Sequence, residues 1–332
     1  MRAPAFWWRP RPGLAARALA PAGAAYGAVS GRRMGMAGTR VGVPVICVGN
    51  FTVGGAGKTP TAIEIARHLV AAGHEPAFVS RGYGGAARSA PLRVDPARHA
   101  AAEVGDEPLL LARVAPCFVG ADRLAAARAA AAAGASAVLM DDGLQNPALA
   151  KDLRVAVVDG AVGIGNGLCL PAGPLRAPMD RQWGGVDLVL VVGPGDAGDA
   201  VAAEAALRRF PVLRATVEPD ARAVGALSGR RLFAFTGIGR PEKFFDTLAG
   251  AGLDVVGRRA FPDHHAFTAA ERDALLRDAA AAGAVLVTTE KDRVRLPADA
   301  PFGAPPIAVL PIRLGFDDPE TLAEMLGRLV GA

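Results

Sequence analysis

The chain has 332 residues, of which 51% are hydrophobic and 21% charged, and its formal net charge is +5. This length is sufficient for two domains, or for one large α/β domain with an appendage. The three cysteines form no CxxC pair, which argues against a disulfide framework and favours small core thiols in a reducing compartment.

The first forty residues form a basic, aromatic segment without any acidic residue. The first carboxylate of the chain is Glu64, and Phe6–Trp8 holds two of the three tryptophans. The basic residues of the segment are Arg2, Arg9, Arg11, Arg17, Arg32, Arg33 and Arg40. Arginine and tryptophan favour anionic membrane surfaces, so we expect residues 1–40 to be an amphipathic segment on the inner face of a membrane. The apolar run Leu14–Ser30 is too short and too interrupted to predict a transmembrane helix. The alternatives are a disordered basic tail and a signal peptide.

A phosphate-binding loop is predicted after Val45–Val48, an apolar run typical of a buried parallel strand. Glycines let the backbone curl so that successive N–H groups point at a phosphate, at the amino end of the helix that follows. Lys58 is expected to contact the β- and γ-phosphates, and the Thr59 hydroxyl to bind Mg²⁺. The residues of this loop are Gly54, Gly55, Ala56, Gly57, Lys58 and Thr59.

This loop departs from the usual P-loop pattern, which has glycine where this chain has Thr52. It is closer to the GGxGK[ST] form, whose additional lysine would fall at Val53. A glycine-rich turn without a ligand is the alternative. Because Lys58 is one of only four lysines in an arginine-rich chain, we predict that the protein binds a nucleoside triphosphate.

The next predicted strand, Glu75–Ser80, is followed by the loop sequence RGYGG. A loop at the carboxyl end of such a strand lies on the ligand-binding edge of an open α/β sheet. Its glycines permit close approach of the backbone, and Arg81 and Tyr83 offer a charge and a flat ring. A plain flexible loop is the alternative.

Two adjacent carboxylates, Asp106 and Glu107, stand at the start of a predicted helix with Pro108 in its first turn. Asp106 is well placed as the N-cap of this helix. In a protein with a P-loop, the two carboxylates are equally suited to act as a general base and a metal ligand.

The run Ala137–Met140 ends in Asp141 and Asp142. Four apolar residues followed by aspartate are typical of a Walker B strand, whose carboxylate holds Mg²⁺ directly or through water. A simple turn at Asp-Asp-Gly is the alternative. Farther along, Gly163–Arg176 is an irregular loop rich in glycine and proline, in which Arg176 is available for an anionic group.

Strands alternate with helices along the chain, which predicts an α/β fold. We expect a P-loop NTPase-type, doubly wound, mostly parallel sheet together with a second, smaller α/β domain. The predicted parts after the N-terminal segment are a P-loop core (41–211), a linker strand (212–224), the smaller domain (225–305), and a returning strand with a C-terminal helix (306–332). The returning strand is expected over Ile307–Leu314.

The only histidine pair of the chain, His264 and His265, follows Asp263. Adjacent side chains project in different directions, which argues against a metal site built from this pair alone. One interpretation is a polar turn before a helix capped by Thr268. The other is an Asp–His arrangement that orients a base in a catalytic cleft.

Eight motifs occur together and in order: GNFTVGGAGKTP, SRGYGG, GDEP, DDGLQ, LPAGPLR, FTGIGRPEKFF, FPDHHAFT and TTEKD. The set resembles the tetraacyldisaccharide 4′-kinase family of the lipid A pathway in Gram-negative bacteria, from the N-terminal segment to the final strand. The resemblance implies an ATP- and Mg²⁺-dependent kinase. Its implied acceptor is the 4′-hydroxyl of a tetraacylated glucosamine disaccharide 1-phosphate, at the cytoplasmic face of the inner membrane.

The resemblance also implies roles for individual residues. Lys58 would contact the phosphates, and Asp106 would accept the proton of the sugar hydroxyl together with His264. The implied metal environment is Thr59, Glu107, Asp141 and Asp142, and the implied substrate or phosphate contacts are Tyr83 and Arg176. The N-terminal segment departs from the family, whose members often carry a more hydrophobic helix there.

The expected partners are therefore a lipid A disaccharide precursor and the anionic inner-membrane surface, without nucleic acid and without an obligate protein partner. One alternative is a P-loop switch ATPase, GTPase or metallochaperone without a lipid substrate, which should carry lysine at the position of Val53. Another is a nucleic-acid-binding ATPase that uses the arginine-rich segment on phosphates, although most of the excess charge lies in that one short segment.

Overall fold

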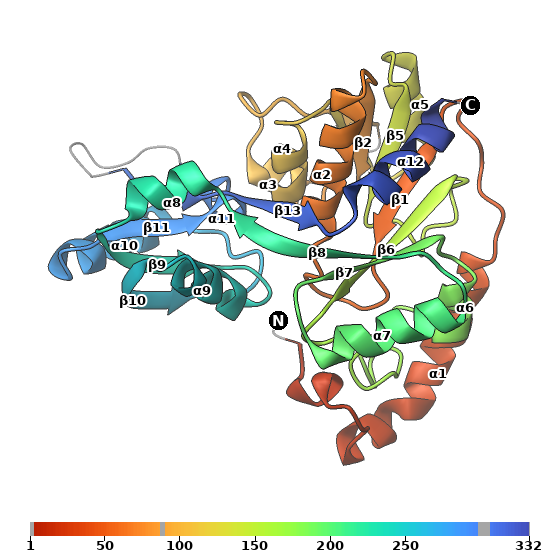
Figure 1. Ribbon diagram of the computed structural model, residues 1–332, viewed down its shortest axis with the longest axis horizontal. Helices are drawn as coiled ribbons and strands as arrows, with labels where there is room; N and C mark the ends of the chain where they lie inside the picture. The colour runs from red at the N-terminus through yellow and green to blue at the C-terminus, as the bar shows by residue number, and fades with distance from the viewer. Residues whose placement is uncertain (1–2, 87–89, 298–305, 332) are drawn as a thin grey trace.

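The computed structural model describes residues 3–86, 90–297 and 306–331. Figure 1 shows two α/β units, a larger one and a smaller one, with β8 and β13 running between them. The predicted α/β class with a second, smaller domain is confirmed.

The larger unit is built on a nine-stranded sheet in the order β13-β8-β7-β6-β1-β5-β2-β4-β3. Its strands are β1 (Val45–Gly49), β2 (Pro76–Ser80), β3 (Leu92–Arg93), β4 (Cys117–Val119), β5 (Ala137–Asp141), β6 (Leu153–Asp159), β7 (Leu188–Val192), β8 (Val212–Pro219) and β13 (Ile312–Phe316). Neighbouring strands are parallel except in the pairs β3–β4 and β8–β13. The mostly parallel sheet predicted from the alternation of strands and helices is therefore confirmed.

Both faces of this sheet are covered, which is why its central strands are continuous apolar runs. Side chains alternate along β1, so that Ile46 and Val48 belong to one hydrophobic cluster while Val45 and Cys47 belong to the other. The first cluster includes α2 (Lys58–Ala71), α4 (Asp106–Leu111) and α12 (Pro319–Val330), and the second includes α5 (Arg123–Ala132) and α7 (Asp196–Leu207). Two short helices complete this unit, α3 (Ala101–Val104) and α6 (Met179–Trp183).

The smaller unit is a four-stranded parallel sheet in the order β10-β9-β11-β12. Its strands are β9 (Arg231–Thr236), β10 (Asp254–Ala260), β11 (Val285–Thr289) and β12 (Ala308–Leu310), and its helices are α8 (Ala221–Leu227), α9 (Pro241–Gly250), α10 (Ala269–Ala281) and α11 (Glu290–Arg293). Thr268 caps α10, as expected, by accepting a hydrogen bond from the Glu271 N–H.

The prediction of a single returning strand over Ile307–Leu314 is wrong, because this stretch contributes one strand to each of the two sheets. β12 ends at Leu310 in the small sheet, and β13 begins at Ile312 in the large one. Pro311 separates them, and proline has no N–H to donate to a strand ladder. β8, expected as a linker strand, is the partner of β13 in the large sheet.

The N-terminal segment is folded against the larger unit, so the alternative of a disordered tail does not describe residues 4–34. It forms the 3₁₀ turn η1 (Ala5–Trp8) and the helix α1 (Leu14–Met34). α1 buries Gly23, Gly27 and Gly31. Among the helices that the structure describes, none is both long and apolar enough to cross a membrane.

Candidate active site

The predicted phosphate-binding loop connects β1 to α2. Gly57 is the N-cap of α2 and has φ of +102°, and Gly54 has φ of +109°. Both values lie in the region that side chains other than glycine avoid, which explains the glycine-rich sequence. No atom lies within 4 Å of where a Cβ would stand at Gly54 or Gly55, so the backbone of the loop is uncovered at both positions.

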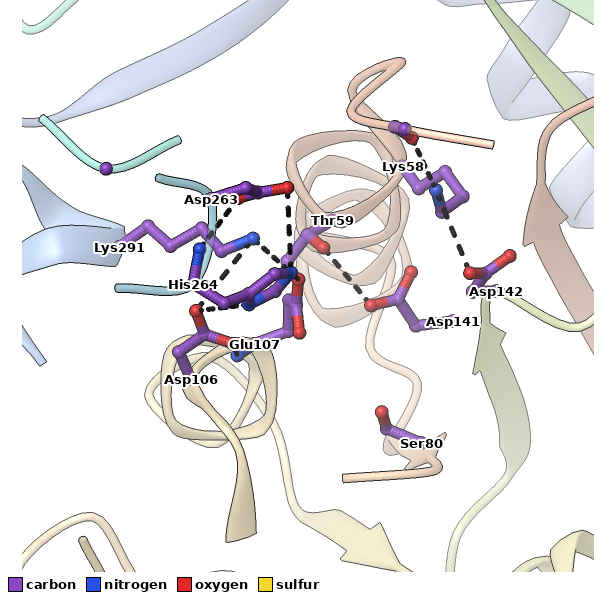
Figure 2. A network of polar contacts seen from close by, with 12 residues as sticks. Lys58, Thr59, Ser80, Asp106, Glu107, Asp141, Asp142, Asp263, His264 and Lys291 are labelled. Carbon is purple, nitrogen blue, oxygen red and sulfur yellow. Dashed lines mark hydrogen bonds and ion pairs between the residues drawn. The ribbon is translucent and has the colours of Figure 1, made fainter. Parts of the chain in front are cut away.

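Lys58 and Thr59, the first two residues of α2, point toward two neighbouring aspartates at the end of β5 (Figure 2). Lys58 Nζ donates to Gly54 O at 3.2 Å and lies 3.8 Å from Asp142 Oδ2. Thr59 Oγ1 donates to Asp141 Oδ2 at 3.2 Å. Burial lowers the pKa of Lys58, although the nearby charge of Asp142 opposes this shift.

Asp141 is buried, and its environment fits a divalent cation. Burial, and next the charge of Glu107, raise its pKa to about 7. Its Oδ1 has no hydrogen-bond partner among the described residues, which is costly for a buried carboxylate unless a cation balances it. Carboxylate and hydroxyl oxygens are the ligands that Mg²⁺ prefers. Asp141 and Thr59 are thus the side chains best placed to hold Mg²⁺.

Asp142, also expected in the metal environment, contacts the side chains of Arg176 and Lys58. Its two carboxylate oxygens accept hydrogen bonds from Arg176 Nη1 and Nη2 at 2.8 and 2.9 Å. Arg176 Nε also donates to Thr52 O at 3.0 Å, two residues before the first glycine of the loop. Arg176 therefore clamps Asp142 to the phosphate-binding loop through a planar, bidentate contact.

A second polar cluster brings together the larger and smaller units (Figure 2). His264 lies in the loop between β10 and α10, and its Nδ1 is 3.0 Å from Asp106 Oδ2 at the start of α4. Arg295 Nε lies 3.1 Å from the same oxygen. Burial alone would raise the pKa of Asp106, but the hydrogen bond from His264 and the charge of Lys291 hold it well below its usual value. Asp106 is therefore an ionised carboxylate facing a histidine.

One interpretation of the sequence makes Asp106 the N-cap of α4, and the structure contradicts it. Gly105 occupies the cap position, without a side-chain cap, and Asp106 is the first helical residue. Its carboxylate is consequently free to contact the smaller unit.

Glu107 belongs mainly to this second cluster. Lys291 Nζ lies 2.7 Å from Glu107 Oε1, and His264 Nε2 lies 3.9 Å from it. Burial raises the pKa of Glu107, and Lys291 offsets part of that shift. Ligand atoms of Asp106, Glu107 and His264 lie within 4.8 Å of one another, but the Lys291 ammonium already supplies positive charge there.

Tyr83 is exposed, and its ring lies edge-on to that of His264, with 5.2 Å between the centroids. This contact connects the RGYGG loop with the histidine. Lys291 and Arg295 were not predicted as site residues. The sequence signal for these two residues is their separation of four positions just after β11, because this spacing places two cations on one face of a helical turn.

Together, the P-loop, the buried aspartate at the end of a parallel strand and the carboxylate–histidine pair define the class of P-loop phosphotransferases. The chain belongs to the tetraacyldisaccharide-1-P 4′-kinase family, LpxK, whose model matches residues 15–330.

Relatives and a solved structure agree with this assignment. A tetraacyldisaccharide 4′-kinase of Methylobacterium nodulans is 58% identical over 96% of this chain and 93% of its own length. The enzyme of that name from Nitrobacter winogradskyi is 51% identical over 98% of this chain and 97% of its own length. The fold matches that of LpxK from Aquifex aeolicus, solved in complex with ATP, with a TM-score of 0.70, 23% identity, and coverage of 95% of this chain and 99% of that one.

Proposed function

We propose that this protein is a kinase that transfers the γ-phosphoryl group of ATP to the 4′-hydroxyl of a tetraacylated disaccharide 1-phosphate, a lipid A precursor. The substrate is inferred from the names of the relatives described above. The observation that carries the reaction type is the contact between His264 Nδ1 and Asp106 Oδ2 at 3.0 Å, in the same site as Lys58, Thr59 and Asp141 (Figure 2). The candidate base Asp106 thus belongs to the same site as the phosphate-binding lysine and the hydroxyl of Thr59 (Figure 2).

Lys58, the N–H groups of Gly54–Gly57 and the amino end of α2 would hold the phosphates and neutralise their charge. Asp141 and Thr59 would hold Mg²⁺, which supplies further neutralisation of the phosphate oxygens when bound. Arg176 and Asp142 would keep the loop in its curled conformation.

The proton of the acceptor hydroxyl would pass to the pair formed by Asp106 and His264. In the transfer, the acceptor O–H bond breaks, a bond from that oxygen to the γ-phosphorus forms, and the bond from the γ-phosphorus to the β-phosphate oxygen breaks to release ADP. Because the pKa of Asp106 is low, its carboxylate is a weak base and would accept the proton late, when the O–P bond is largely formed. The hydrogen bond from His264 fixes the direction of the carboxylate.

The exposed side of α1 is suited to a membrane surface. Leu14 and Val29 are 87% and 64% exposed, and Tyr26 is also exposed, whereas the glycines of the opposite side are buried. Arg32 and Arg33 lie in the last turn of the helix. An apolar side flanked by cations binds anionic lipid. We propose that α1 lies on the cytoplasmic face of the inner membrane, where both ATP and the lipid head group are accessible.

ADP release tests this function. Purified protein would receive MgATP with the tetraacylated disaccharide 1-phosphate in detergent micelles, or with the same lipid lacking the 4′-hydroxyl. We expect ADP release with the first lipid only, and its loss in Lys58→Ala. ADP release at equal rates with both lipids, or without lipid, would instead favour a switch ATPase.

A further inference from the structure

A single loop, residues 163–178, lies between the phosphate-binding loop and the N-terminal segment. On the side of the phosphate-binding loop, Val53 N donates to Pro174 O at 2.8 Å, and Arg176 N donates to Phe51 O at 2.9 Å. Thr52 and Leu175 form an antiparallel bridge. The backbone of this loop therefore runs beside the residues that precede Gly54, and its last part carries the Arg176 clamp.

The other side of the same loop is held by the N-terminal segment. Ser30 Oγ, on α1, donates to the carbonyl oxygen of Arg176 itself at 2.6 Å. Trp7 Nε1, in η1, donates to Pro171 O at 3.0 Å, and Asn166 N donates to Trp7 O at 2.7 Å. Residues more than a hundred positions apart in the chain thus fix the backbone of the loop at three points.

Close packing accompanies these hydrogen bonds. A Cβ at Gly27 would lie 2.9 Å from Cys169 Sγ, and one at Gly23 would lie 2.8 Å from Cys169 O. Such distances are too short for any side chain, so α1 can approach the loop this closely only because both positions are glycine. The buried side of α1 therefore fits this loop, while its other side stays exposed.

We propose that the N-terminal segment is a positioning element of the nucleotide site, with Ser30 and Trp7 as positioning residues that act through the loop 163–178. By holding the carbonyl of Arg176 and the backbone of Pro171, they keep the Arg176 guanidinium in place against Asp142 and Thr52. The segment would thus have two separate roles, one on each side of α1. This inference rests on the proposed function for one point, the identity of the nucleotide as ATP.

The test separates nucleotide binding from membrane binding. The full chain in detergent without lipid would be titrated with a fluorescent ATP analogue and Mg²⁺. Ser30→Ala, which removes one hydrogen bond, should raise the Kd about two- to tenfold. Gly27→Leu, which forces α1 away from Cys169, should raise it more. Ala28→Leu is the matched control: it adds the same side chain one position along, at an exposed site of the same helix, and should leave the Kd unchanged.

Hydrogen exchange at the amides of residues 51–57 gives a second readout that does not require nucleotide. Faster exchange in Ser30→Ala and Gly27→Leu, but not in Ala28→Leu, would support the inference even if the wild-type chain failed to bind the ATP analogue, a result that would overturn the proposed function alone. Unchanged exchange and unchanged Kd in both variants would overturn the inference that the N-terminal segment positions the nucleotide site.

Discussion

His264 Nδ1 lies 3.0 Å from Asp106 Oδ2, although the two residues are 158 positions apart and belong to different units of the fold. The larger unit supplies the carboxylate and the phosphate-binding loop, and the smaller unit supplies the histidine. The candidate base is therefore complete only when the two units are in contact.

Removing either member of this pair is expected to slow the reaction without weakening nucleotide binding. Asp106→Asn or His264→Gln should lower kcat by about 10²- to 10⁴-fold, and the Kd for ATP should change little because neither residue contacts the phosphate-binding loop. If they act as a unit, the double variant should lose no more than the worse single variant. Steady-state kinetics of the three variants would check this.

His265→Gln is the matched control for this prediction, because His265 is adjacent in sequence but contacts Glu271 in its own unit, at 3.0 Å. A loss in His265→Gln as large as that in His264→Gln would mean that the effect is structural.

A separate ion-pair cluster holds the two units together. Asp159, buried at the end of β6, lies 2.6 Å from both Arg240 Nη1 and Lys243 Nζ at the start of α9. Asp159→Asn would leave two cations without their partner, so we expect the units to separate more readily. Solution scattering should show a larger radius of gyration and kcat should fall. Asp199→Asn, which removes an exposed ion pair with Arg214, should change neither quantity.

The Arg176 clamp should not tolerate lysine. Lysine cannot make the bidentate contact with Asp142, so Arg176→Lys should raise the Kd for ATP about tenfold, at roughly 1.4 kcal/mol for the lost charged contact. Arg154 makes a similar bidentate contact with Asp187, and Arg154→Lys is the control. Equal effects of the two substitutions on nucleotide titrations would contradict a specific role for Arg176.

Asp141 should make the folded protein less stable as the pH rises, which is the opposite of the usual effect of a carboxylate. Its pKa rises from 3.8 to about 7 on folding, so the folded state holds this proton more tightly than the unfolded chain does. The free energy of unfolding should therefore decrease as the pH rises from about 4 to about 7, by an amount on the order of 4 kcal/mol. Asp141→Asn should raise the Tm near pH 8 and have little effect near pH 4, as measured without metal.

The neighbouring carboxylate provides the opposite case. Burial would raise the pKa of Asp142, but Lys58 and Arg176 lower it, so its contribution to stability is present above its usual pKa and is lost in acid. Asp142→Asn should therefore lower the Tm near pH 8. The same change of Tm in both variants would contradict the different environments assigned to the two aspartates.

Membrane binding should depend on the exposed side of α1. Replacing Leu14 and Val29 together by serine removes exposed apolar surface from α1. Because each Å² of apolar contact with lipid contributes about 25 cal/mol, the fraction of protein that floats with anionic vesicles should fall severalfold. Val70→Ser, a similar change on α2 where Val70 is 49% exposed, is the control. Unchanged flotation of the Leu14/Val29 variant would contradict the assigned membrane-facing side.

Local sequence patterns predicted the parallel sheet and the phosphate-binding loop because both are encoded by contiguous residues. Each of three features can be recognised from a few neighbouring residues: the apolar run Val45–Val48, the glycines that follow it, and Asp141 at the end of its own apolar run. Their physical reasons, strand burial and glycine conformations, are local.

Contacts across the fold were harder to predict. Nothing adjacent to Asp142 in sequence indicates that Arg176 would occupy both of its carboxylate oxygens, and nothing near Asp106 indicates Arg295. The glycines of α1 interrupt the apolar run in the sequence, and only the structure shows that they permit close packing on the loop 163–178. Such pairings depend on topology, which one sequence does not specify residue by residue.

The measurement that tests the account most directly is the fate of labelled γ-phosphate. Wild-type protein and Asp106→Asn would be incubated with labelled ATP, Mg²⁺ and the tetraacylated disaccharide 1-phosphate, and the lipid product would be identified by mass spectrometry and ³¹P NMR. We predict a bis-phosphorylated lipid with the label at the 4′ position, formed by the wild type and nearly absent with Asp106→Asn. Label at another hydroxyl, label only in inorganic phosphate, or equal product from both proteins would contradict the account.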